Sequence, residues 1–208
     1  MPLFKTISFP QGIIGLWQFT ESTADLLPNF SSEELEDPTF LKYTHEKRKL
    51  EWLATRRLIS QLIGPDFAIS YLETGKPILQ HDRFQHISIS HSRDFAAVIL
   101  HENQSVGIDI EDASRDFSRI ERRFLSDEEL AVVGNNPLLQ CLYWCAKEAI
   151  FKLVDDQGID FKKQIHISED TTNNNFQGKF ISEMGEISFQ LHHEYFSGNC
   201  MVWVVGKK

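Results

Sequence analysis

Gly-Ile-Asp-Ile-Glu at residues 107–111 is the strongest structural signal in this chain. Its apolar and acidic residues alternate, which predicts a strand whose two isoleucines turn into a core. Asp109 and Glu111 then point to the opposite face. The strand is therefore expected to present two carboxylates on one surface.

A second stretch, Trp-Cys-Ala-Lys-Glu-Ala-Ile-Phe-Lys at residues 144–152, has the periodicity of a helix. Apolar residues recur at three- and four-residue steps from Leu138 to Leu153 and form one stripe. Asn136 followed by Pro137 is typical of a helix start, and residues 155–158 are typical of a helix end. These signals predict one long helix between them.

On this helix Glu148 and Lys152 are neighbours, i and i+4, at the shoulder of the apolar stripe, whereas Lys147 is expected on the side that faces water. A carboxylate at the edge of a core needs a partner, and the two carboxylates of the strand cannot approach it without a cation between them. Three converging carboxylates, Asp109, Glu111 and Glu148, therefore predict a divalent metal ion. The nearby Lys152 predicts a phosphate as the other ligand of that metal.

Each stretch by itself also has a simpler interpretation. An alternating strand with exposed acids is typical of a half-buried strand, and a Lys–Glu pair on a helix shoulder is typical of a surface ion pair. The metal hypothesis depends on the two stretches together and on the segments that precede them.

The composition describes an ordinary soluble globular protein of 208 residues, with 41% apolar and 25% charged residues. The formal net charge of -9 argues against a role at nucleic acids or membrane surfaces, which requires a basic face. The N-terminus lacks the pattern of an export signal, and no stretch is long and apolar enough to span a membrane. Three cysteines form no disulfide framework, so we expect free thiols in a cytoplasmic protein.

The first third of the chain is expected to form a strand and a long helix. Residues 13–19 have strand character, and residues 40–63 have helical periodicity. The helix is basic and includes Arg48 and Arg56. These basic residues either form a solvated face or place one or two arginines on an anion.

Two further segments present polar groups in a loop and at a strand end. Residues 74–77, Thr-Gly-Lys-Pro, form a loop whose glycine and proline restrict the backbone and leave Lys76 projecting. Residues 86–92 alternate as a strand that ends in Ser90, His91 and Ser92. Hydroxyls and an imidazole at a strand end are suited to receive an anion.

The rest of the chain is predicted to form short strands and helical turns. Strands are expected at residues 95–101 and 105–111, and helical turns at residues 116–125 and 126–133. Four alternating runs predict a second antiparallel sheet: residues 164–168, 176–181, 186–196 and 200–206. Blocks of strand and helix without regular βαβ spacing predict the α+β class. The turn at residues 102–105 is the candidate boundary and divides the chain almost in half.

Five motifs together resemble, in order and spacing, those of the 4'-phosphopantetheinyl transferase superfamily. They are Gly-Lys-Pro at residues 75–77, Ile-Ser-Ile-Ser-His-Ser at 87–92, Gly-Ile-Asp-Ile-Glu at 107–111, Phe-Leu-Ser-Asp-Glu-Glu at 124–129 and the helix motif at 144–152. The length resembles that of the monomeric type, which activates polyketide and nonribosomal peptide synthetases. The resemblance implies transfer of the 4'-phosphopantetheine arm of coenzyme A to a serine of an apo acyl or peptidyl carrier protein, with release of 3',5'-ADP.

The resemblance also implies an architecture. Two similar α/β halves, residues 1–103 and 104–208, are expected about a pseudo-twofold axis, each with a small antiparallel sheet packed against a long helix. Coenzyme A is expected in the cleft between them, and the protein is expected to be a monomer.

The resemblance further implies roles for residues around the pyrophosphate of coenzyme A. These are Asp109, Glu111 and Glu148 as Mg²⁺ ligands, Lys152 on the pyrophosphate, Ser90 and His91 as a phosphate-binding pair, and Lys76 as a coenzyme A contact. The physical interpretation agrees, because the charge of a pyrophosphate must be neutralised before a hydroxyl can approach it. Mg²⁺ with Lys152 and His91 beside it would do this.

Two roles have competing candidates. The base that takes the proton of the attacking serine is expected to be Glu148 or Glu129, directly or through water. For Glu129 the third position of a capping box is a competing explanation. Residues 21–37 contain no Lys or Arg, although relatives often place lysines there to bind the 3'-phosphate. We therefore expect Arg48 or Arg56, with His91, to bind it.

Two other functions remain as alternatives: a non-catalytic coenzyme A or carrier-protein binding module of the same fold, and a Mg²⁺-dependent phosphohydrolase. For the transferase, carrier docking is expected at an apolar patch at residues 117–125. Arg119, Arg122 and Arg123 would give that patch a local positive charge.

Overall fold

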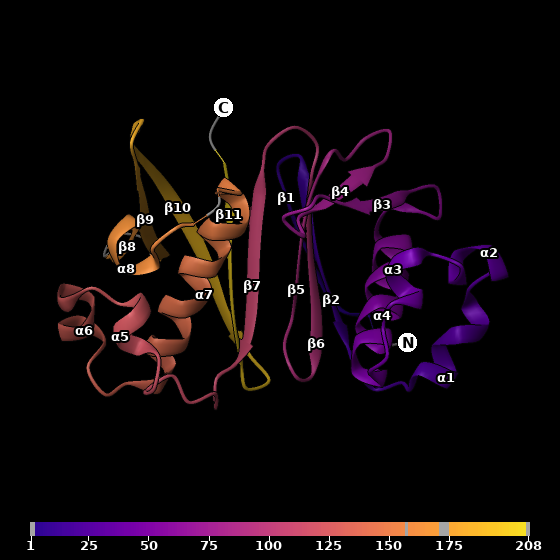
Figure 1. Ribbon diagram of the computed structural model, residues 1–208, viewed down its shortest axis with the longest axis horizontal. Coiled ribbons are helices and arrows are strands. Elements are labelled where there is room, and N and C mark those ends of the chain that lie inside the picture. The colour runs from indigo at the N-terminus through magenta and orange to yellow at the C-terminus, as the bar shows by residue number, and fades with distance from the viewer. Residues whose placement is uncertain (1–2, 157, 171–174, 207–208) are drawn as a thin grey trace.

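The computed structural model of this protein describes residues 3–156, 158–170 and 175–206. In this part of the chain the strands form a four-stranded sheet, a five-stranded sheet and a two-stranded hairpin, and every paired strand is antiparallel to its neighbour (Figure 1). None of the helices described is both long enough and apolar enough to cross a membrane. The predicted mixture of helices and antiparallel sheets is therefore confirmed.

The first sheet has the strand order β1-β2-β6-β5. Its strands are β1 (Leu3–Phe9), β2 (Gly12–Gln18), β5 (His86–His91) and β6 (Phe95–His101). Between β2 and β5 the chain forms α1 (Thr23–Leu26), the 3-10 helix η1 (Leu27–Asn29), α2 (Ser32–Leu35), α3 (Pro38–Leu41), α4 (Glu46–Ile63) and the hairpin of β3 (Ala68–Tyr71) and β4 (Pro77–Gln80).

The second sheet has the strand order β7-β11-β10-β9-β8. Its strands are β7 (Val106–Asp112), β8 (Ile165–Asp170), β9 (Asn175–Ser182), β10 (Gly185–Phe196) and β11 (Asn199–Val205). The helices between β7 and β8 are α5 (Glu121–Phe124), α6 (Asp127–Val133), α7 (Pro137–Val154) and α8 (Phe161–Gln164). All four strands predicted in the last quarter of the chain are present.

The two sheets lie between the two long helices (Figure 1). Helix α4 packs on β2 and β6, and α7 packs on β7 and β11. Apolar side chains from β2, β6, β7 and β11 form a core between the sheets, including Leu16, Ile99 and Ile110, all fully buried. Each long helix therefore covers the outer face of one sheet, and the predicted boundary at residues 103 and 104 falls in the turn between β6 and β7.

The helix boundaries follow local signals closely in α7 and less closely in α4. Asn136 caps α7 by accepting hydrogen bonds from two backbone amides, and Pro137 is its first residue, as predicted. The predicted start of the first long helix near residue 40 is wrong, because the chain turns between α3 and α4, and α4 begins only after His45. Strand β1 was not predicted; its residues are alternately half-buried and exposed at the edge of the first sheet.

The two sheets meet where β5 lies beside β7. Ser88 Oγ accepts a hydrogen bond from the amide of Ile108 at 3.2 Å, and Ser90 Oγ accepts one from the amide of Ile110 at 3.3 Å. Buried amides at a strand edge need acceptors, and here side-chain hydroxyls supply them instead of a neighbouring strand. The alternation of isoleucine and serine in β5 is thus explained, since the serines face β7.

A close approach of β7 and α7 depends on Gly107. A Cβ atom at this position would lie 1.9 Å from the carbonyl oxygen of Ala149 and 3.2 Å from the amide nitrogen of Leu153. Any larger residue would push the helix away from the strand. The glycine of the 107–111 motif therefore allows Glu148 and Lys152 to reach the carboxylate face of β7.

Gly107→Ala tests this approach. We expect the free energy of unfolding to fall by about 1–3 kcal/mol, because the new methyl group meets helix backbone that cannot rotate away. Urea denaturation would measure the loss. Gly12→Ala is the matched control, since a Cβ there meets only the side chain of Phe9, at 2.2 Å, which can shift. Equal losses in the two variants would contradict this explanation.

Candidate active site

A pocket of about 380 Å³ lies where the loop between β3 and β4, strand β5 and the end of α7 meet. Its lining includes Lys76, Ser88, Ile89, Lys152 and Asp155. The structure therefore brings together two lysines that were predicted to contact coenzyme A. They come from opposite sides of the seam, the line along which β5 of the first sheet meets β7 of the second. The predicted loop at residues 74–77 supplies one wall.

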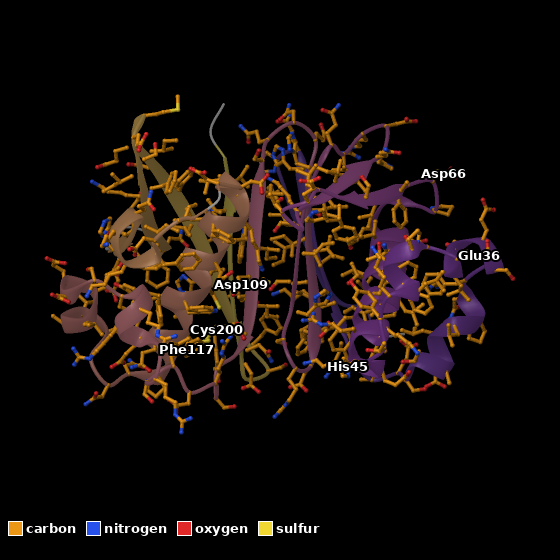
Figure 2. The ribbon with its side chains drawn as sticks, in the orientation of Figure 1. Glu36, His45, Asp66, Asp109, Phe117 and Cys200 are labelled. Atoms are coloured by element: carbon orange, nitrogen blue, oxygen red, sulfur yellow. The ribbon has the colours of Figure 1, made fainter. Side chains whose placement is uncertain are left out.

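Asp109 lies near the middle of β7 (Figure 2), and its side chain is almost fully buried. Its Oδ1 atom accepts hydrogen bonds from Ser90 Oγ at 2.7 Å and Lys152 Nζ at 2.8 Å. The ammonium group of Lys152 also donates to the carbonyl of Ile108 at 3.0 Å. Asp109 Oδ2 is buried and has no hydrogen-bond partner among the residues described. One oxygen of this carboxylate is thus satisfied, and the other is buried without a partner among the described residues.

Glu111 is held by two residues that the sequence did not single out for this role. Its carboxylate accepts a hydrogen bond from Trp144 Nε1 at 3.1 Å and forms an ion pair with Arg115. Burial raises the pKa of Glu111, and the charge of Asp109 raises it further. The tryptophan of the helix motif therefore orients a carboxylate of the strand motif.

Glu148 is the most strongly perturbed of the three acids. Burial raises its pKa to about 7, with a further contribution from Asp109, while Lys152 opposes the shift. A raised pKa on a carboxylate means that its negative charge lacks full compensation. Asp109, Glu111 and Glu148 thus interact electrostatically across the space between β7 and α7.

These residues suit a hard divalent cation chemically, although they are not arranged around one. No three His, Cys, Asp or Glu side chains within residues 3–156, 158–170 and 175–206 are grouped closely enough to hold a metal. Lys152 and Arg115 instead pair with Asp109 and Glu111. The unpartnered Oδ2 of Asp109 and the raised pKa values of the other two acids are the features that a Mg²⁺ ion would satisfy.

A second, much smaller pocket of about 50 Å³ lies between α4 and β5. Arg48, Arg56 and His91 all line it, so the structure brings together the three residues predicted to bind the 3'-phosphate. Tyr43 and Tyr71, which the sequence did not single out, complete its aromatic rim. Ile89 lines both pockets, which places them next to each other along β5.

The arginines of this small pocket already have acidic partners. Arg48 pairs with Glu51 at 2.9 Å, and Arg56 pairs with Asp37 at 3.4 Å. The guanidinium carbon of Arg56 also lies 3.5 Å from the ring centre of Trp52, in cation–π geometry. An anion in this pocket would therefore compete with two internal carboxylates.

His91 is neutral in this structure. Its Nε2 lies 2.8 Å from Thr55 Oγ1, whose own proton goes to the carbonyl of Glu51 at 2.7 Å, so the imidazole is the donor to Thr55. Burial lowers the pKa of His91 to about 3, and the positive charge of Lys152 contributes. In this structure His91 therefore offers hydrogen bonding and no positive charge, and its role beside a phosphate stays a prediction.

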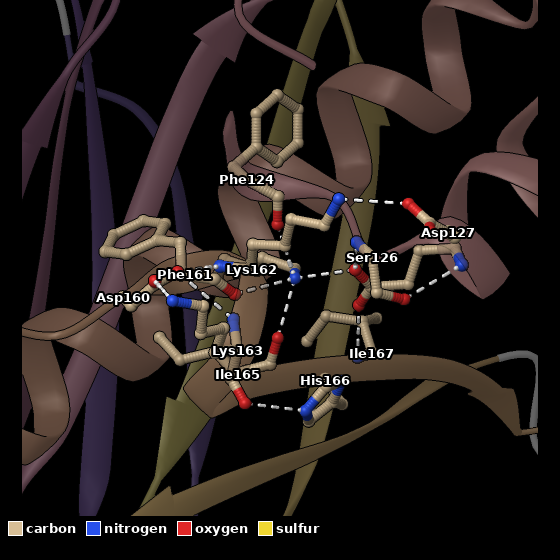
Figure 3. A network of polar contacts seen from close by, with 12 residues as sticks. Phe124, Ser126, Asp127, Asp160, Phe161, Lys162, Lys163, Ile165, His166 and Ile167 are labelled. Carbon is tan, nitrogen blue, oxygen red and sulfur yellow. Dashed lines mark hydrogen bonds and ion pairs between the residues drawn. The ribbon is translucent and has the colours of Figure 1, made fainter. Parts of the chain in front are cut away.

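The prediction that Lys147 faces water is wrong. Its side chain is 0% exposed, and four oxygens lie within hydrogen-bond distance of its ammonium group: Glu129 Oε2 at 2.7 Å and the carbonyls of Phe124 at 2.6 Å, Phe161 at 3.0 Å and Ile165 at 2.6 Å. Figure 3 labels the three residues that supply these carbonyls. The prediction considered only the angle of Lys147 around the helix axis relative to one apolar stripe, which put this lysine on the side that faces water. Helix α7 is instead covered on a second side by the segments around α5, α6 and α8, which the stripe does not reveal.

Glu129 belongs to this buried network and not to the acids at the seam. One oxygen accepts from the amide of Ser126 at 2.7 Å, as in a capping box, and the other accepts from the amide of Ile167 at 2.8 Å. With Lys147 as a third partner, the carboxylate is fully engaged. The capping explanation is therefore favoured over the role of a base.

The predicted apolar docking patch at residues 117–125 is not a surface. Phe117, Phe124 and Leu125 are buried, and Phe117 lies inside the second half of the molecule (Figure 2). Phe117 packs edge-on against Phe124 at 6.1 Å between ring centres, which explains the apolar pattern as core. Arg119, Arg122 and Arg123 are exposed, so only the basic part of the predicted patch remains.

The comparisons with known proteins agree with the motifs. Residues 105–204 match a family model described as the 4'-phosphopantetheinyl transferase superfamily, so the predicted resemblance to this family is confirmed over nearly half of the chain. These residues include β7 and α7, which carry the three acids and Lys152.

Individual relatives are similar over a shorter range. The 4'-phosphopantetheinyl transferase AcpT of Escherichia coli (strain K12) is 34% identical over 92 residues, which cover 44% of this chain and 43% of the relative. The AcpT protein of Salmonella typhi is 33% identical over 81 residues, which cover 39% of this chain and 42% of the relative. The matched segments thus span less than half the length of these curated relatives.

Lys147→Met tests the buried network. Removing one member of a buried ion pair leaves the other charge uncompensated, and we expect a loss of about 3–5 kcal/mol in the free energy of unfolding. Lys162→Met is the control: its pair with Asp127 at 2.9 Å is exposed, and we expect a loss below about 1 kcal/mol. Chemical denaturation would measure the free energy of unfolding of both variants. Similar small losses of stability in the two would contradict the buried network.

The lowered pKa of His91 predicts a pH dependence of stability. The folded imidazole stays neutral down to about pH 3, whereas the unfolded one takes up a proton near its ordinary pKa of 6.5. This stabilisation is therefore complete above pH 6.5 and is lost as the pH falls from 6.5 toward 3. Between pH 7 and 5 the wild type should lose about 1–2 kcal/mol more than His91→Gln.

Thermal and chemical unfolding at several pH values would measure this difference. His45→Gln, in which an exposed histidine before α4 is replaced, is the control and should keep the wild-type pH dependence. Identical pH profiles for wild type and His91→Gln would show that His91 titrates in the folded protein.

Proposed function

We propose that this protein transfers the 4'-phosphopantetheine arm of coenzyme A to a serine of an apo acyl or peptidyl carrier protein and releases 3',5'-ADP. The observation that carries the proposal is the meeting of Asp109, Glu148 and Lys152 at the seam between β5 and β7, beside a pocket that also contains Lys76. Strand β7 and helix α7, which carry these three residues, belong to the segment that matches the superfamily.

Coenzyme A would lie along β5. Lys76 and Lys152 supply positive charge to the larger pocket, and the smaller pocket with Arg48, Arg56 and His91 adjoins it at Ile89, where the 3'-phosphate is expected. Ser90 Oγ donates to Asp109 and accepts from the amide of Ile110. Its proposed role is therefore to position Asp109.

Lys152 is suited to hold a diphosphate oxygen. Its ammonium group reaches Asp109 from the helix and also lines the larger pocket, so one side chain connects the acids to the place where the nucleotide would lie. Mg²⁺ would be held by Asp109, Glu111 and Glu148 and would neutralise charge on the diphosphate. Asp109 also pairs with Lys152, and Glu111 with Arg115, so each of these acids has a basic partner within the protein.

Glu148 is the proposed base. Its carboxylate lies near Asp109 and Lys152, where it could accept the proton of the attacking serine directly or through water. Glu129 is not proposed in this role, because both of its carboxylate oxygens have partners in the buried network.

The two-half architecture supports a cleft site and is part of the proposal. We propose that residues 1–103 and 104–208 act as two similar halves related by a pseudo-twofold axis. The arrangement of one sheet and one long helix in each half favours this relation. Arg119, Arg122 and Arg123 form the exposed basic surface that an acidic carrier protein would meet.

Incubation with coenzyme A, Mg²⁺ and an apo carrier protein, followed by mass measurement of the carrier, tests the function. We expect a phosphopantetheine mass gain that excess chelator abolishes and Mg²⁺ restores. Asp109→Asn should lower kcat/KM by about 100-fold or more, since a metal ligand supplies several kcal/mol of transition-state stabilisation. Asp112→Asn, on the same strand but bonded to Ser114, should keep wild-type activity.

Three outcomes separate the candidate functions. Transfer that persists in excess chelator would remove the metal from the proposal. Coenzyme A binding without transfer would favour a non-catalytic binding module. Cleavage of coenzyme A without modification of the carrier would favour a phosphohydrolase.

A further inference from the structure

The residue directly after α7 has an unusual conformation for its type. Asp155 caps the helix with φ 52° and ψ 39°, in the left-handed region that glycine usually occupies at helix ends. Its negative charge also lies at the helix C-terminus, where the helix dipole is already negative. Local structure therefore favours glycine here, and the contacts of the aspartate side chain must lie elsewhere in the fold.

The side chain of Asp155, which follows α7, contacts residues in the half of the molecule that contains the first sheet. Asp155 Oδ2 lies 3.4 Å from Lys76 Nζ, and Asp155 Oδ1 accepts a hydrogen bond from Thr74 Oγ1 at 3.4 Å. Both partners belong to the loop between β3 and β4, which is far from α7 in sequence. Both oxygens of one carboxylate thus engage the same loop.

The loop that Asp155 engages is shaped to present Lys76. Gly75 has φ 86°, and its amide donates to the carbonyl of Leu72, while the amide of Leu72 donates to the carbonyl of Lys76. Lys76, Thr74 and Asp155 all line the larger pocket. The ion pair therefore lies in the wall of the space where coenzyme A is proposed to bind.

We infer that Asp155 is a latch on Lys76, an internal carboxylate that occupies this lysine when the pocket is empty and must release it before Lys76 can contact a phosphate of the nucleotide. The inference rests on the proposed function, because it takes coenzyme A as the ligand. The carboxylate and the ligand phosphate compete for one ammonium group, and the carboxylate also repels the incoming charge.

The latch has a consequence for turnover. Each phosphate contact of Lys76 forms at the expense of an existing ion pair, so both coenzyme A and the product 3',5'-ADP bind less tightly than they would to a free lysine. When the product leaves, Asp155 pairs with Lys76 again, which favours release. Asp155 thus sets the affinity for the nucleotide without contacting the reacting atoms.

Isothermal titration calorimetry with coenzyme A and with 3',5'-ADP tests the latch without requiring transfer. Asp155→Asn keeps a side chain that tolerates the left-handed conformation and removes the charge. We expect it to lower both dissociation constants by about two- to fivefold, the range of a partly exposed ion pair. In a Lys76→Ala background the same substitution should have no such effect, because there is no lysine to release.

Asp156→Asn is the matched control. Asp156 lines the same pocket and carries the same charge, but it forms no ion pair within the described residues. It therefore measures the general effect of removing one negative charge from the rim, and we expect a smaller gain in affinity than for Asp155→Asn. Asp155→Gly provides a second variant, which should also raise the midpoint of thermal unfolding because it relieves the backbone conformation.

The outcomes are separable from those of the proposed function. The latch is supported if Asp155→Asn tightens binding more than Asp156→Asn and only when Lys76 is present. It is overturned if Asp155→Asn weakens binding, matches the control, or acts equally with and without Lys76. If the wild-type protein neither binds coenzyme A nor modifies a carrier, the proposed function fails, and the latch fails with it.

Discussion

The hydrogen bonds at the seam between β5 and β7 join the two sheets and position the candidate site. Two sheets meet there without a backbone ladder, and the amides of β7 would be buried without acceptors if Ser88 and Ser90 did not supply hydroxyls. The same hydroxyl of Ser90 that accepts from β7 also donates to Asp109. The same set of hydrogen bonds therefore joins the two sheets and orients Asp109, the central acid of the candidate site.

Charge compensation distinguishes the two lysines of the α7 motif. Lys147 is surrounded by oxygens in the interior and stabilises the packing of α5, α6 and α8 on α7, where an unpaired charge would be costly. Lys152 is partly exposed in the pocket and pairs with an acid that also senses two other carboxylates. One lysine is thus part of the fold, and the other is available to a ligand.

The pockets along β5 share a pattern of internal ion pairs. Lys76 pairs with Asp155, Arg48 with Glu51, Arg56 with Asp37, and Lys152 with Asp109. Each cation proposed to meet a phosphate is therefore balanced by a carboxylate of the protein. This balance fits a chain whose net charge is -9, in which isolated positive groups attract nearby acids.

Much of the fold follows from local signals in the sequence. The alternation in β7, the cap at Asn136 and the four strands near the end of the chain depend on neighbouring residues, and the structure contains them where they were predicted. The nearness of Asp109 to Lys152 was also predicted, because strand and helix each expose one defined face. These features need only the periodicities of single elements.

Tertiary structure alone decided which side chains each charged residue meets. The apolar period of α7 predicts which side of the helix faces the sheet, but it does not predict the second layer that buries Lys147. Likewise, no local pattern pairs Trp144 with Glu111 or Asp155 with Lys76. Such contacts join segments far apart in the chain, so they depend on how strands and helices pack. Local patterns therefore predict the strands, the helices and the candidate acids, whereas the packing of distant segments separates the charged residues that stabilise the fold from those that can meet a ligand.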